Sequence, residues 1–335
     1  MNIRDLAKHL NISIGTVSRA LNGRPYVDEA TRARVLAAAA QFGYSPNFAG
    51  RSLRQGTTGM VAMMLPTSDG VVVADTIFMM VLEGLRRFFI GQKLDLLVLL
   101  AEPENADFSY LRRVADRRLV DGVIIADILQ DDPRIEYLLG KNLPFVAYGR
   151  SRTPGRYAWI DFDIEGATAA AVERLLRRGY DRIALGTLTP GVNYGAIVEE
   201  TLRAVMARHG LAADPVLYIE ASEQGGYAFG EKWLQLSPRP SAVLLASARM
   251  AIGFYKRLAE AGLAAARDVA VVAIVEEPNA RYLRPQLTHF AVDLQGLGVR
   301  LGEALMLEMQ DNRRAPVQEL FPMRLSLGDS DSGPI

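Results

Sequence analysis

The 335-residue chain contains no cysteine, which excludes disulfide bonds, thiolate metal sites and cysteine nucleophiles. Its three histidines leave little for metal binding, so we expect neither a metal nor any other cofactor. No apolar run approaches the roughly 20 residues of a membrane-spanning helix, and the clearest one is 269–275. The opening MNIRDLAKHL lacks the apolar stretch of a signal peptide. We therefore expect a soluble, cytoplasmic protein with no membrane partner.

The chain also lacks net charge, because 38 basic residues balance 38 acidic ones. The charge is unevenly distributed, however. Residues 1–58 carry eight basic and three acidic side chains, a net +5, and the remainder carries 30 and 35, a net −5. A basic segment on an acidic body indicates a nucleic-acid-binding end.

The first 45 residues have the apolar spacing of three short helices. Two of them are separated only by 11–13, where Ser13 is placed to cap the second helix through the free N–H near Thr16. Asp28 can cap the third, which ends at Gly43. The buried positions that this pattern predicts for the third helix are Val35, Ala39 and Phe42.

Residues 46–58 have few large apolar side chains and read as a linker. From residue 59 the pattern alternates short apolar runs with helical stretches, which is typical of parallel sheets covered on both faces. The strand-like runs are GMVAMML, LDLLVLL, DGVIIAD, PFVAYG, RIALG, SAVLLAS and DVAVVAIV, and the helix-like segments are 76–91, 107–118, 165–178, 193–209, 223–236 and 248–262. These units exceed one open sheet, so we expect two doubly wound subdomains with a ligand cleft between them.

The second helix carries hydroxyl side chains and one arginine near its N-terminus. Hydroxyls and free N–H groups there can hold phosphate, and Arg19 can reach the O6 and N7 atoms of guanine. These features favour a DNA-recognition helix, although a two-helix unit of this size can also be a plain helical hairpin.

The segments IRDLAKHLNISIGTVSRALNG, VDEATRARVLAAAAQFGYSPN and AGRSLRQGTTG together resemble the headpiece of the LacI/GalR family of bacterial transcription regulators. VDGVIIAD, RRGYDRIALG and PQLTHFAVDLQGLG are similar to the core of that family. The resemblance implies an α/β protein with an all-α helix-turn-helix headpiece at 1–45, a hinge linker at 46–58 and a periplasmic-binding-protein-like core of two doubly wound subdomains at 59–328. The polar residues 329–335 are expected to form a flexible tail.

The resemblance also implies roles for individual headpiece residues. Ile14, Gly15 and Arg19 match the positions that read base edges in the major groove. Leu53 matches a hinge leucine that wedges into the minor groove of operator DNA, assisted by Arg51. The remaining expected DNA contacts are Ser13, Thr16, Ser18, Asn22, Tyr44 and Asn47.

For the core, the resemblance implies a small-molecule effector such as a sugar or another metabolite. PFVAYGR and YAWIDFD are similar to a branch that responds to α-glucosides and related oligosaccharides, and Trp159 is either a sugar-facing ring or a core residue. Common pocket residues of the family are absent at Val198, Ser247 and Val275. The cleft candidates, chosen mainly because ligands bind beyond the carboxyl ends of parallel strands, are Asp127, Tyr148, Asn193, Tyr194, Ser247 and Glu276.

Three classes of protein fit the whole chain to different degrees. A regulator, most commonly a repressor in this family, would act as a homodimer on palindromic double-stranded operator DNA. An enzyme lacks support, since the sequence has no G-x-G-x-x-G after the first strand, no G-x-S-x-G and no H-E-x-x-H. A pure solute-binding protein fits the core but not the basic headpiece. The sequence thus predicts an effector-controlled transcription regulator.

Overall fold

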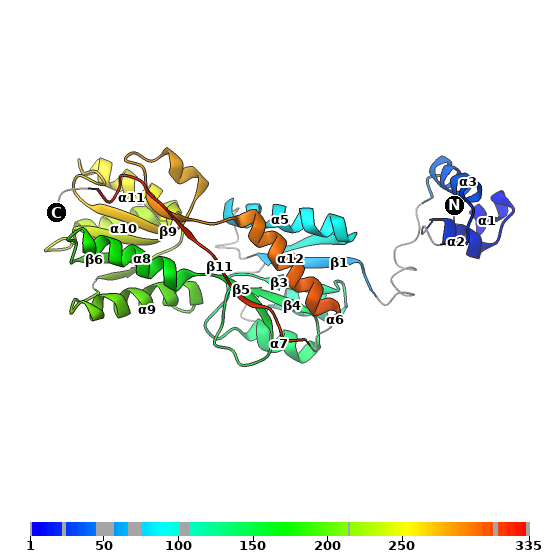
Figure 1. Ribbon diagram of the computed structural model, residues 1–335, viewed down its shortest axis with the longest axis horizontal. Helices are drawn as coiled ribbons and strands as arrows, with labels where there is room; N and C mark the ends of the chain where they lie inside the picture. The colour runs from blue at the N-terminus through cyan, green and yellow to red at the C-terminus, as the bar shows by residue number, and fades with distance from the viewer. Residues whose placement is uncertain are drawn as a thin grey trace. The chain divides into compact units, whose positions relative to one another are not determined.

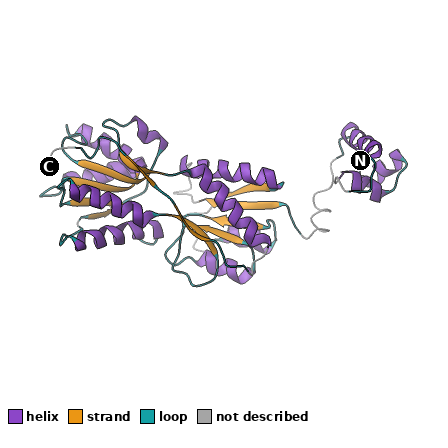
Figure 2. Cartoon of the chain, viewed as in Figure 1, coloured by secondary structure: helices purple, strands orange, loops and turns teal. Residues whose placement is uncertain are grey.

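The computed structural model describes residues 2–21, 25–44, 57–65, 76–100, 108–213, 215–310 and 314–332. The chain divides into two units, Met1–Thr58 and Gly59–Ile335, which we call the headpiece and the core. Figure 1 shows both, and Figure 2 shows that the described headpiece is helical whereas the core mixes helices and strands.

The headpiece contains α1 (Ile3–Leu10), α2 (Ile14–Leu21) and α3 (Glu29–Gln41). Asn2 caps α1 in a capping box with Asp5, and Asp28 caps α3 through the Thr31 N–H. Small and aliphatic residues from all three helices are buried together, as the helical spacing predicts. The prediction for Phe42 was wrong, because its side chain is 38% exposed and packs edge-on against His9 with ring centroids 4.7 Å apart.

The first subdomain of the core is built on a six-stranded, all-parallel sheet in the order β11-β5-β4-β3-β1-β2. Its strands are β1 (Met60–Leu65), β2 (Asp95–Leu100), β3 (Gly122–Ile125), β4 (Phe145–Tyr148), β5 (Ala158–Phe162) and β11 (Gln318–Phe321), and its helices are α5 (Thr76–Gln92), α6 (Ser109–Asp116), α7 (Pro133–Lys141) and α12 (Leu294–Gln310).

Alternation along β1 explains how this sheet is covered on both faces. Val61 and Met63 pack in the same cluster as the buried residues of α5 and α12, whereas Ala62 and Met64 pack with those of α6 and α7. Successive side chains of a strand point to opposite faces, so an uninterrupted apolar run supplies a core on each side.

The second subdomain repeats this architecture in the order β12-β10-β9-β8-β6-β7, and only the β10–β12 pair is antiparallel. Its strands are β6 (Ile183–Thr187), β7 (Val216–Tyr218), β8 (Ala242–Ser247), β9 (Ala270–Val275), β10 (Thr288–Ala291) and β12 (Arg324–Ser326). Its helices are α8 (Ile164–Arg177), α9 (Asn193–Arg208), α10 (Glu223–Leu234), α11 (Ala248–Glu260) and the 3₁₀ turn η1 (Pro278–Tyr282).

The chain passes between the two subdomains three times: from β5 to α8, from β10 to α12 and from β11 to β12. The strand β11 can be followed from one lobe towards the other in Figure 1. At the first two passages an aspartate caps the next helix, Asp163 through the Gly166 N–H at 3.0 Å and Asp293 through the Gly296 N–H at 2.8 Å. The subdomains are therefore connected by short segments that lead directly into capped helices.

The predicted fold class is confirmed, with a helical headpiece and two doubly wound subdomains. The flexible tail expected at 329–335 was wrong for Ser330 and Asp331, whose side chains are fully buried. Ser330 Oγ donates to the Val271 carbonyl at 2.6 Å, and Asp331 accepts from Thr288 Oγ1 at 2.7 Å. These bonds fix residues that a small, polar composition suggested would fray. Among the described residues, no helix has both the length and the apolar character to cross a membrane.

Candidate functional site

The predicted recognition helix α2 starts with the cap that the sequence suggests. Ser13 Oγ accepts the Thr16 N–H at 3.1 Å, and the two hydroxyl oxygens lie 2.9 Å apart. This bond satisfies one of the free N–H groups at the helix start. It also fixes both hydroxyls at the end of the helix where the backbone attracts anions such as phosphate.

The outer surface of α2 carries the residues expected to read bases. Ile14 is 45% exposed and therefore does not belong to the core of the headpiece. Arg19 is exposed, and its guanidinium lies beside Gly15, because a Cβ atom at Gly15 would be 3.8 Å from an Arg19 terminal nitrogen. Gly15 and Arg19 therefore lie side by side on this surface, at ordinary van der Waals distance. Ser18 is half-buried on the same helix.

Tyr44, the next expected DNA contact, is half-buried and packs against the apolar core of the headpiece. It therefore has a structural role in addition to any contact with DNA. The other expected contacts, Asn22, Asn47, Arg51 and Leu53, lie outside the residues that the structure describes.

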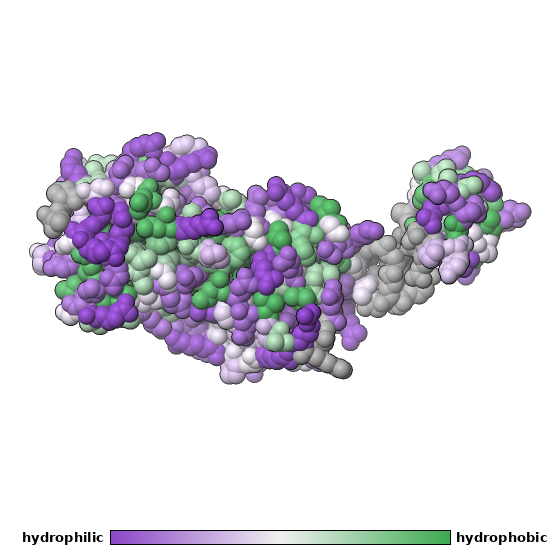
Figure 3. Space-filling model, in the orientation of Figure 1, coloured by the Kyte–Doolittle hydropathy of each residue, from purple (hydrophilic) through white to green (hydrophobic). Residues whose placement is uncertain are grey.

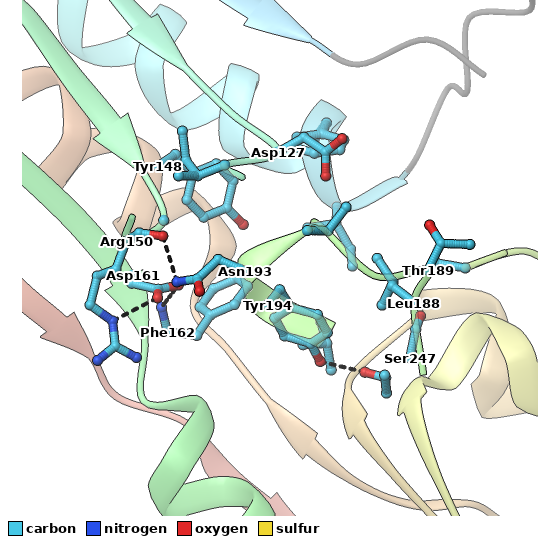
Figure 4. Close-up of a pocket in the computed structure, with 18 of the residues that line it drawn as sticks. Asp127, Tyr148, Arg150, Asp161, Phe162, Leu188, Thr189, Asn193, Tyr194 and Ser247 are labelled. Atoms are coloured by element: carbon cyan, nitrogen blue, oxygen red, sulfur yellow. Dashed lines mark hydrogen bonds and ion pairs between the residues drawn. The ribbon is translucent and has the colours of Figure 1, made fainter. Parts of the chain in front are cut away.

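A cavity of about 380 Å³ lies between the two subdomains of the core, at the carboxyl ends of strands from both sheets. Strand ends at this edge are where ligands of doubly wound folds bind. Figure 4 shows Asp127 and Tyr148, from the first subdomain, across the cavity from Tyr194 and Ser247, from the second. The lining consists of Ile77, Phe78, Asp127, Ile128, Tyr148, Gly149, Arg150, Asp161, Phe162, Leu188, Thr189, Val192, Asn193, Tyr194, Ile219, Glu220, Ala221, Ala246, Ser247 and Val275.

Five of the six residues predicted for the cleft line this cavity, and Glu276 does not. The Glu276 carboxylate accepts the Val292 N–H at 2.9 Å, at the passage from β10 to α12. Val275, which replaces a residue expected of the family, does line the cavity. Val198 is fully buried in α9. The structure thus brings together the strand-end residues and removes Glu276 from the group.

Asp127 stands out in the cavity because its side chain is exposed there although neighbouring protein atoms partly desolvate it. Burial raises the pKa of Asp127 above its usual value, and nearby Arg134 opposes the rise. Its backbone adopts the left-handed conformation, with φ 55°. Arg134 holds that conformation by donating from Nη2 to the Asp127 carbonyl at 2.9 Å.

A second carboxylate in the lining, Asp161, is only 5% exposed. Burial raises its pKa, and Arg150 opposes that rise by donating from Nε at 2.9 Å. Arg150 also donates from Nη2 to Glu165 of α8 at 2.7 Å. Because Glu165 belongs to the second subdomain, this arginine both neutralises a cavity carboxylate and links the two subdomains.

Further bonds join the subdomains beside the cavity. The backbone of Gln130 donates to the Gly191 carbonyl at 2.9 Å, and that of Asn193 donates to the Ile128 carbonyl at 3.0 Å, which forms a short antiparallel bridge. Asn193 also donates from Nδ2 to the Arg150 carbonyl at 2.6 Å, the bond drawn in Figure 4. The loops after β3 and before α9 are thus bonded directly to each other.

Sequence reasoning missed Arg150, Asp161 and the aromatic wall of the cavity. Phe78 and Phe162 each pack edge-on against Tyr148, with centroids 6.1 and 5.6 Å apart. One signal was available, since an aspartate inside the apolar strand β5 must be buried and therefore needs a partner. Trp159, either a sugar-facing ring or a core residue by sequence, does not line the cavity; it packs against buried residues of the first subdomain and lies under the Arg150 guanidinium at 5.6 Å.

Comparison with known proteins identifies the chain. The model of the lacI family of bacterial regulatory proteins matches residues 2–47, and that of the periplasmic binding protein-like domain matches residues 172–330. The HTH-type transcriptional regulator AglR of Rhizobium meliloti (strain 1021) is 32% identical over 333 residues, 97% of this chain and 92% of the relative. The chain belongs to the LacI family. This LacI-family protein is accordingly a DNA-binding transcription regulator of the helix-turn-helix type.

Other relatives extend the comparison. RafR of Escherichia coli, also an HTH-type transcriptional regulator, is 35% identical over 246 residues, 73% of this LacI-family chain and 72% of the relative. Two solved structures share the fold. A lac repressor dimer bound to operator and the anti-inducer ONPF matches with a TM-score of 0.89, 22% identity and coverage of 100% and 99% of the two chains. A complex of the regulator CelR with cellobiose matches with a TM-score of 0.74, 23% identity and coverage of 98% and 99%.

Proposed function

We propose that this regulator binds operator DNA through the exposed surface of α2 and that a sugar bound in the core cavity controls its operator affinity. The observation that carries the first half is the arrangement of Ser13, Thr16 and Arg19 on one short helix. Two hydroxyls lie at its N-terminus, and an exposed guanidinium lies one turn further along. Phosphate contacts position such a helix, whereas the arginine supplies base readout.

Within this proposal the headpiece residues have different roles. Arg19 donates two hydrogen bonds to guanine, and Ile14 contacts a thymine methyl group. Ser13, Thr16 and Ser18 hold backbone phosphates. The contacts assigned to Asn22, Tyr44, Asn47 and Arg51, and the minor-groove wedge assigned to Leu53, remain predictions.

The cavity supports the second half of the proposal. It has an aromatic wall and a few polar groups at strand ends, which is the composition of a small-molecule site. Two solved structures of similar fold contain sugars, CelR with cellobiose and a LacI family regulator from Enterococcus faecium with ribose. A sugar that prefers one arrangement of the subdomains would shift the equilibrium between arrangements and so change DNA binding.

A homodimer is the proposed assembly, because a palindromic operator needs two headpieces. Met79 and Ile90 of α5, together with Val98 and Leu100 of the edge strand β2, are between 39% and 60% exposed. Apolar side chains gathered on neighbouring elements favour a protein interface. Figure 3 shows hydrophobic surface near α5 and α12 on one face of the core. A cytoplasmic location, the absence of catalytic activity and repression rather than activation complete the proposal.

The test is a selection of genomic fragments by the purified full-length chain at fixed salt. Arg19→Ala should reduce the preference for the selected palindrome over scrambled DNA by about 1–3 kcal/mol, the contribution of one bidentate base contact. The matched control is Arg4→Ala, which removes one exposed positive charge from α1. It should weaken binding to both DNAs equally, because phosphate attraction carries no sequence information.

Two outcomes would contradict the proposal. An Arg19→Ala variant that weakens binding to both DNAs equally, as Arg4→Ala is expected to do, would show that Arg19 acts only as a charge. Binding that is sensitive to salt but indifferent to sequence in the unmodified protein would leave the core as a solute-binding module. The same selection with Leu53→Ala tests the proposed hinge wedge.

A further inference from the structure

The charges that line the cavity are unbalanced. The described lining contains three carboxylates, Asp127, Asp161 and Glu220, and one cation, Arg150. Arg150 is already bonded to Asp161 at 2.9 Å and to Glu165 at 2.7 Å. Its charge is therefore compensated by two carboxylates before any ligand arrives, and an anionic group on a ligand would meet a negative site.

Asp127 is the carboxylate left for a ligand. Among the described residues, no group bonds to its side chain, which is exposed in the cavity, and neighbouring protein atoms partly desolvate it. A partly desolvated carboxylate is stabilised by charge-assisted hydrogen bonds. Its backbone lies in the left-handed region, which aspartate tolerates better than most non-glycine residues. The exposed carboxylate is therefore open to a hydrogen-bond donor on a ligand.

Two of the donors that line the cavity, the Asn193 amide and the Tyr194 hydroxyl, are used internally. Asn193 donates from Nδ2 to the Arg150 carbonyl at 2.6 Å, which orients its Oδ1 as a free acceptor. The Tyr194 hydroxyl donates to the Ala246 carbonyl. Ser247 Oγ accepts the Arg249 N–H at 3.2 Å, so its hydroxyl proton remains available. A ligand that satisfies these groups must bring several donors of its own, and hydroxyl groups do so without adding charge.

We propose that the cavity selects a neutral, hydroxyl-rich ligand, a free sugar without phosphate or carboxylate, and that Asp127 enforces this choice by accepting two ligand hydroxyls. This inference rests on the proposed role of the cavity as the effector site. A ligand phosphate about 6 Å from Asp127 is disfavoured about 100-fold at an effective dielectric constant of about 20. A hydroxyl pair gains charge-assisted hydrogen bonds from the same carboxylate.

The experiment is isothermal titration of the full-length chain with matched ligand series at fixed salt. The neutral probes are glucose, galactose, ribose, cellobiose, maltose and sucrose. The anionic counterparts are glucose 6-phosphate, galactose 6-phosphate, ribose 5-phosphate, glucuronate and galacturonate, and glucosamine and galactosamine are the cationic ones. We expect at least one neutral sugar to bind, and its anionic counterpart to bind at least about 100-fold more weakly.

Variants locate this selectivity. Asp127→Asn keeps the size of the side chain and its tolerance of left-handed backbone, and should weaken binding of the neutral sugar about 10- to 100-fold, as expected for a hydrogen bond to a charged group. The variant should also show a smaller difference in affinity between the neutral sugar and its phosphate ester. The matched control is Asp131→Asn, which removes the same charge from an exposed position outside the lining and should change neither quantity. Melting temperature and operator affinity report whether each variant is folded.

Three results would overturn the proposal. Tighter binding of a phosphate or uronate, or of an amino sugar, would refute neutral selectivity while leaving an effector in the cavity. Unchanged affinity and discrimination in Asp127→Asn would remove Asp127 from the site. Failure of every probe to bind, with operator binding intact, would refute both the selectivity and the proposed effector function, and would leave the DNA-binding function standing.

Discussion

Asp331, near the C-terminus, provides the sharpest test of how the core is held together. Its carboxylate is fully buried and bonds to three side chains. Oδ2 lies 2.5 Å from Arg174 Nε and 3.3 Å from Arg178 Nε, and Oδ1 accepts from Thr288 Oγ1 at 2.7 Å. Asp331→Asn keeps the shape and one acceptor but leaves two arginines facing a neutral group.

The expected size of the effect follows from these contacts. Removing one partner of a buried ion pair typically destabilises a protein by 3–5 kcal/mol. The Arg178 side chain is 38% exposed and can turn towards water, and the asparagine still accepts from Thr288, so the lower limit applies. A loss of about 3 kcal/mol corresponds to a decrease of roughly 6–10 °C in the melting temperature of a domain of this size.

The assay is thermal unfolding of the full-length chain at pH 7, followed by circular dichroism and calorimetry. Asp329→Asn is the matched control, because Asp329 is exposed and should shift the transition by less than about 1 °C. Arg174→Gln should destabilise the unmodified protein but add little to Asp331→Asn, since the pair is already broken. Equal melting temperatures for the Asp331 and Asp329 variants would refute the conclusion that Asp331 anchors its segment to the core.

Three further predictions concern the core. Asp127→Asn should raise the melting temperature of the ligand-free protein at pH 7. Burial raises the pKa of this carboxyl in the folded chain, so the unmodified protein loses stability as the pH rises from 3.8 through the raised pKa. The difference in melting temperature between the variant and the unmodified protein should therefore disappear at acidic pH, which thermal unfolding at several pH values would test. Gly253→Ala should prevent normal folding, since its Cβ would lie 1.7 Å from a backbone oxygen of α10. Gly140 has open space around it, so Gly140→Ala should raise the free energy of unfolding by up to about 1 kcal/mol, as measured by denaturant titration. Arg152→Glu breaks an exposed 2.6 Å ion pair with Glu200 across the subdomains and should change sugar affinity less than about fivefold. The double variant with Glu200→Arg should restore the original sugar affinity. A larger loss of affinity that the double variant does not restore would contradict the conclusion that this pair contributes little.

The helices and strands that could be predicted from the sequence are those whose apolar residues follow a single regular pattern along the whole segment. The run that forms β9 is uniformly apolar, and the segments that form α9 and α11 keep helical spacing throughout. The helix α12 was missed because glycines interrupt it. Those glycines are needed for close packing, since a Cβ at Gly298 would lie 2.2 Å from the Val81 carbonyl oxygen of α5. The requirement comes from a neighbour some 200 residues away, which local propensity cannot register.

The short strands β10, β11 and β12 were missed for a different reason. Each spans only three or four residues, and β11 and β12, which lie at sheet edges, have mostly exposed or half-buried side chains. Strands this short resemble polar loops in sequence, because only pairing to a sheet distinguishes them. β7 and β5 were overlooked as well, and β5 carries the buried Asp161 of the cavity. The omission of one strand thus concealed one of the charged groups of the site.

The candidate site shows which part of a cavity can be predicted from strand ends. Asp127, Tyr148 and Ser247 lie where parallel strands terminate, so the topology alone places them at the cavity. Glu276 also follows a strand, but the passage from β10 to α12 runs beside it. The Glu276 carboxylate accepts the Val292 N–H of that passage. Strand-end reasoning therefore fails at a position where another segment of the chain supplies the partner.

The bonds between the subdomains set the scale of the energy that an effector must supply. Three hydrogen bonds cross beside the cavity, two between backbones and one from Asn193, in addition to the ion pairs Arg150–Glu165 and Arg152–Glu200. At about 0.5–1.5 kcal/mol each, the three hydrogen bonds alone favour the observed arrangement by roughly 1.5–4.5 kcal/mol. A shift of a two-state equilibrium from 1:99 to 99:1 needs about 5.5 kcal/mol of differential binding. A sugar bonded by Asp127 on one side and by groups of α9 on the other contacts both subdomains at once. Its hydrogen bonds can therefore all form only in the observed arrangement of the subdomains, and they add to the hydrogen bonds that already join the subdomains. The two free energies are of similar size, so a ligand that makes a few hydrogen bonds to both subdomains can control an equilibrium to which these hydrogen bonds and ion pairs contribute.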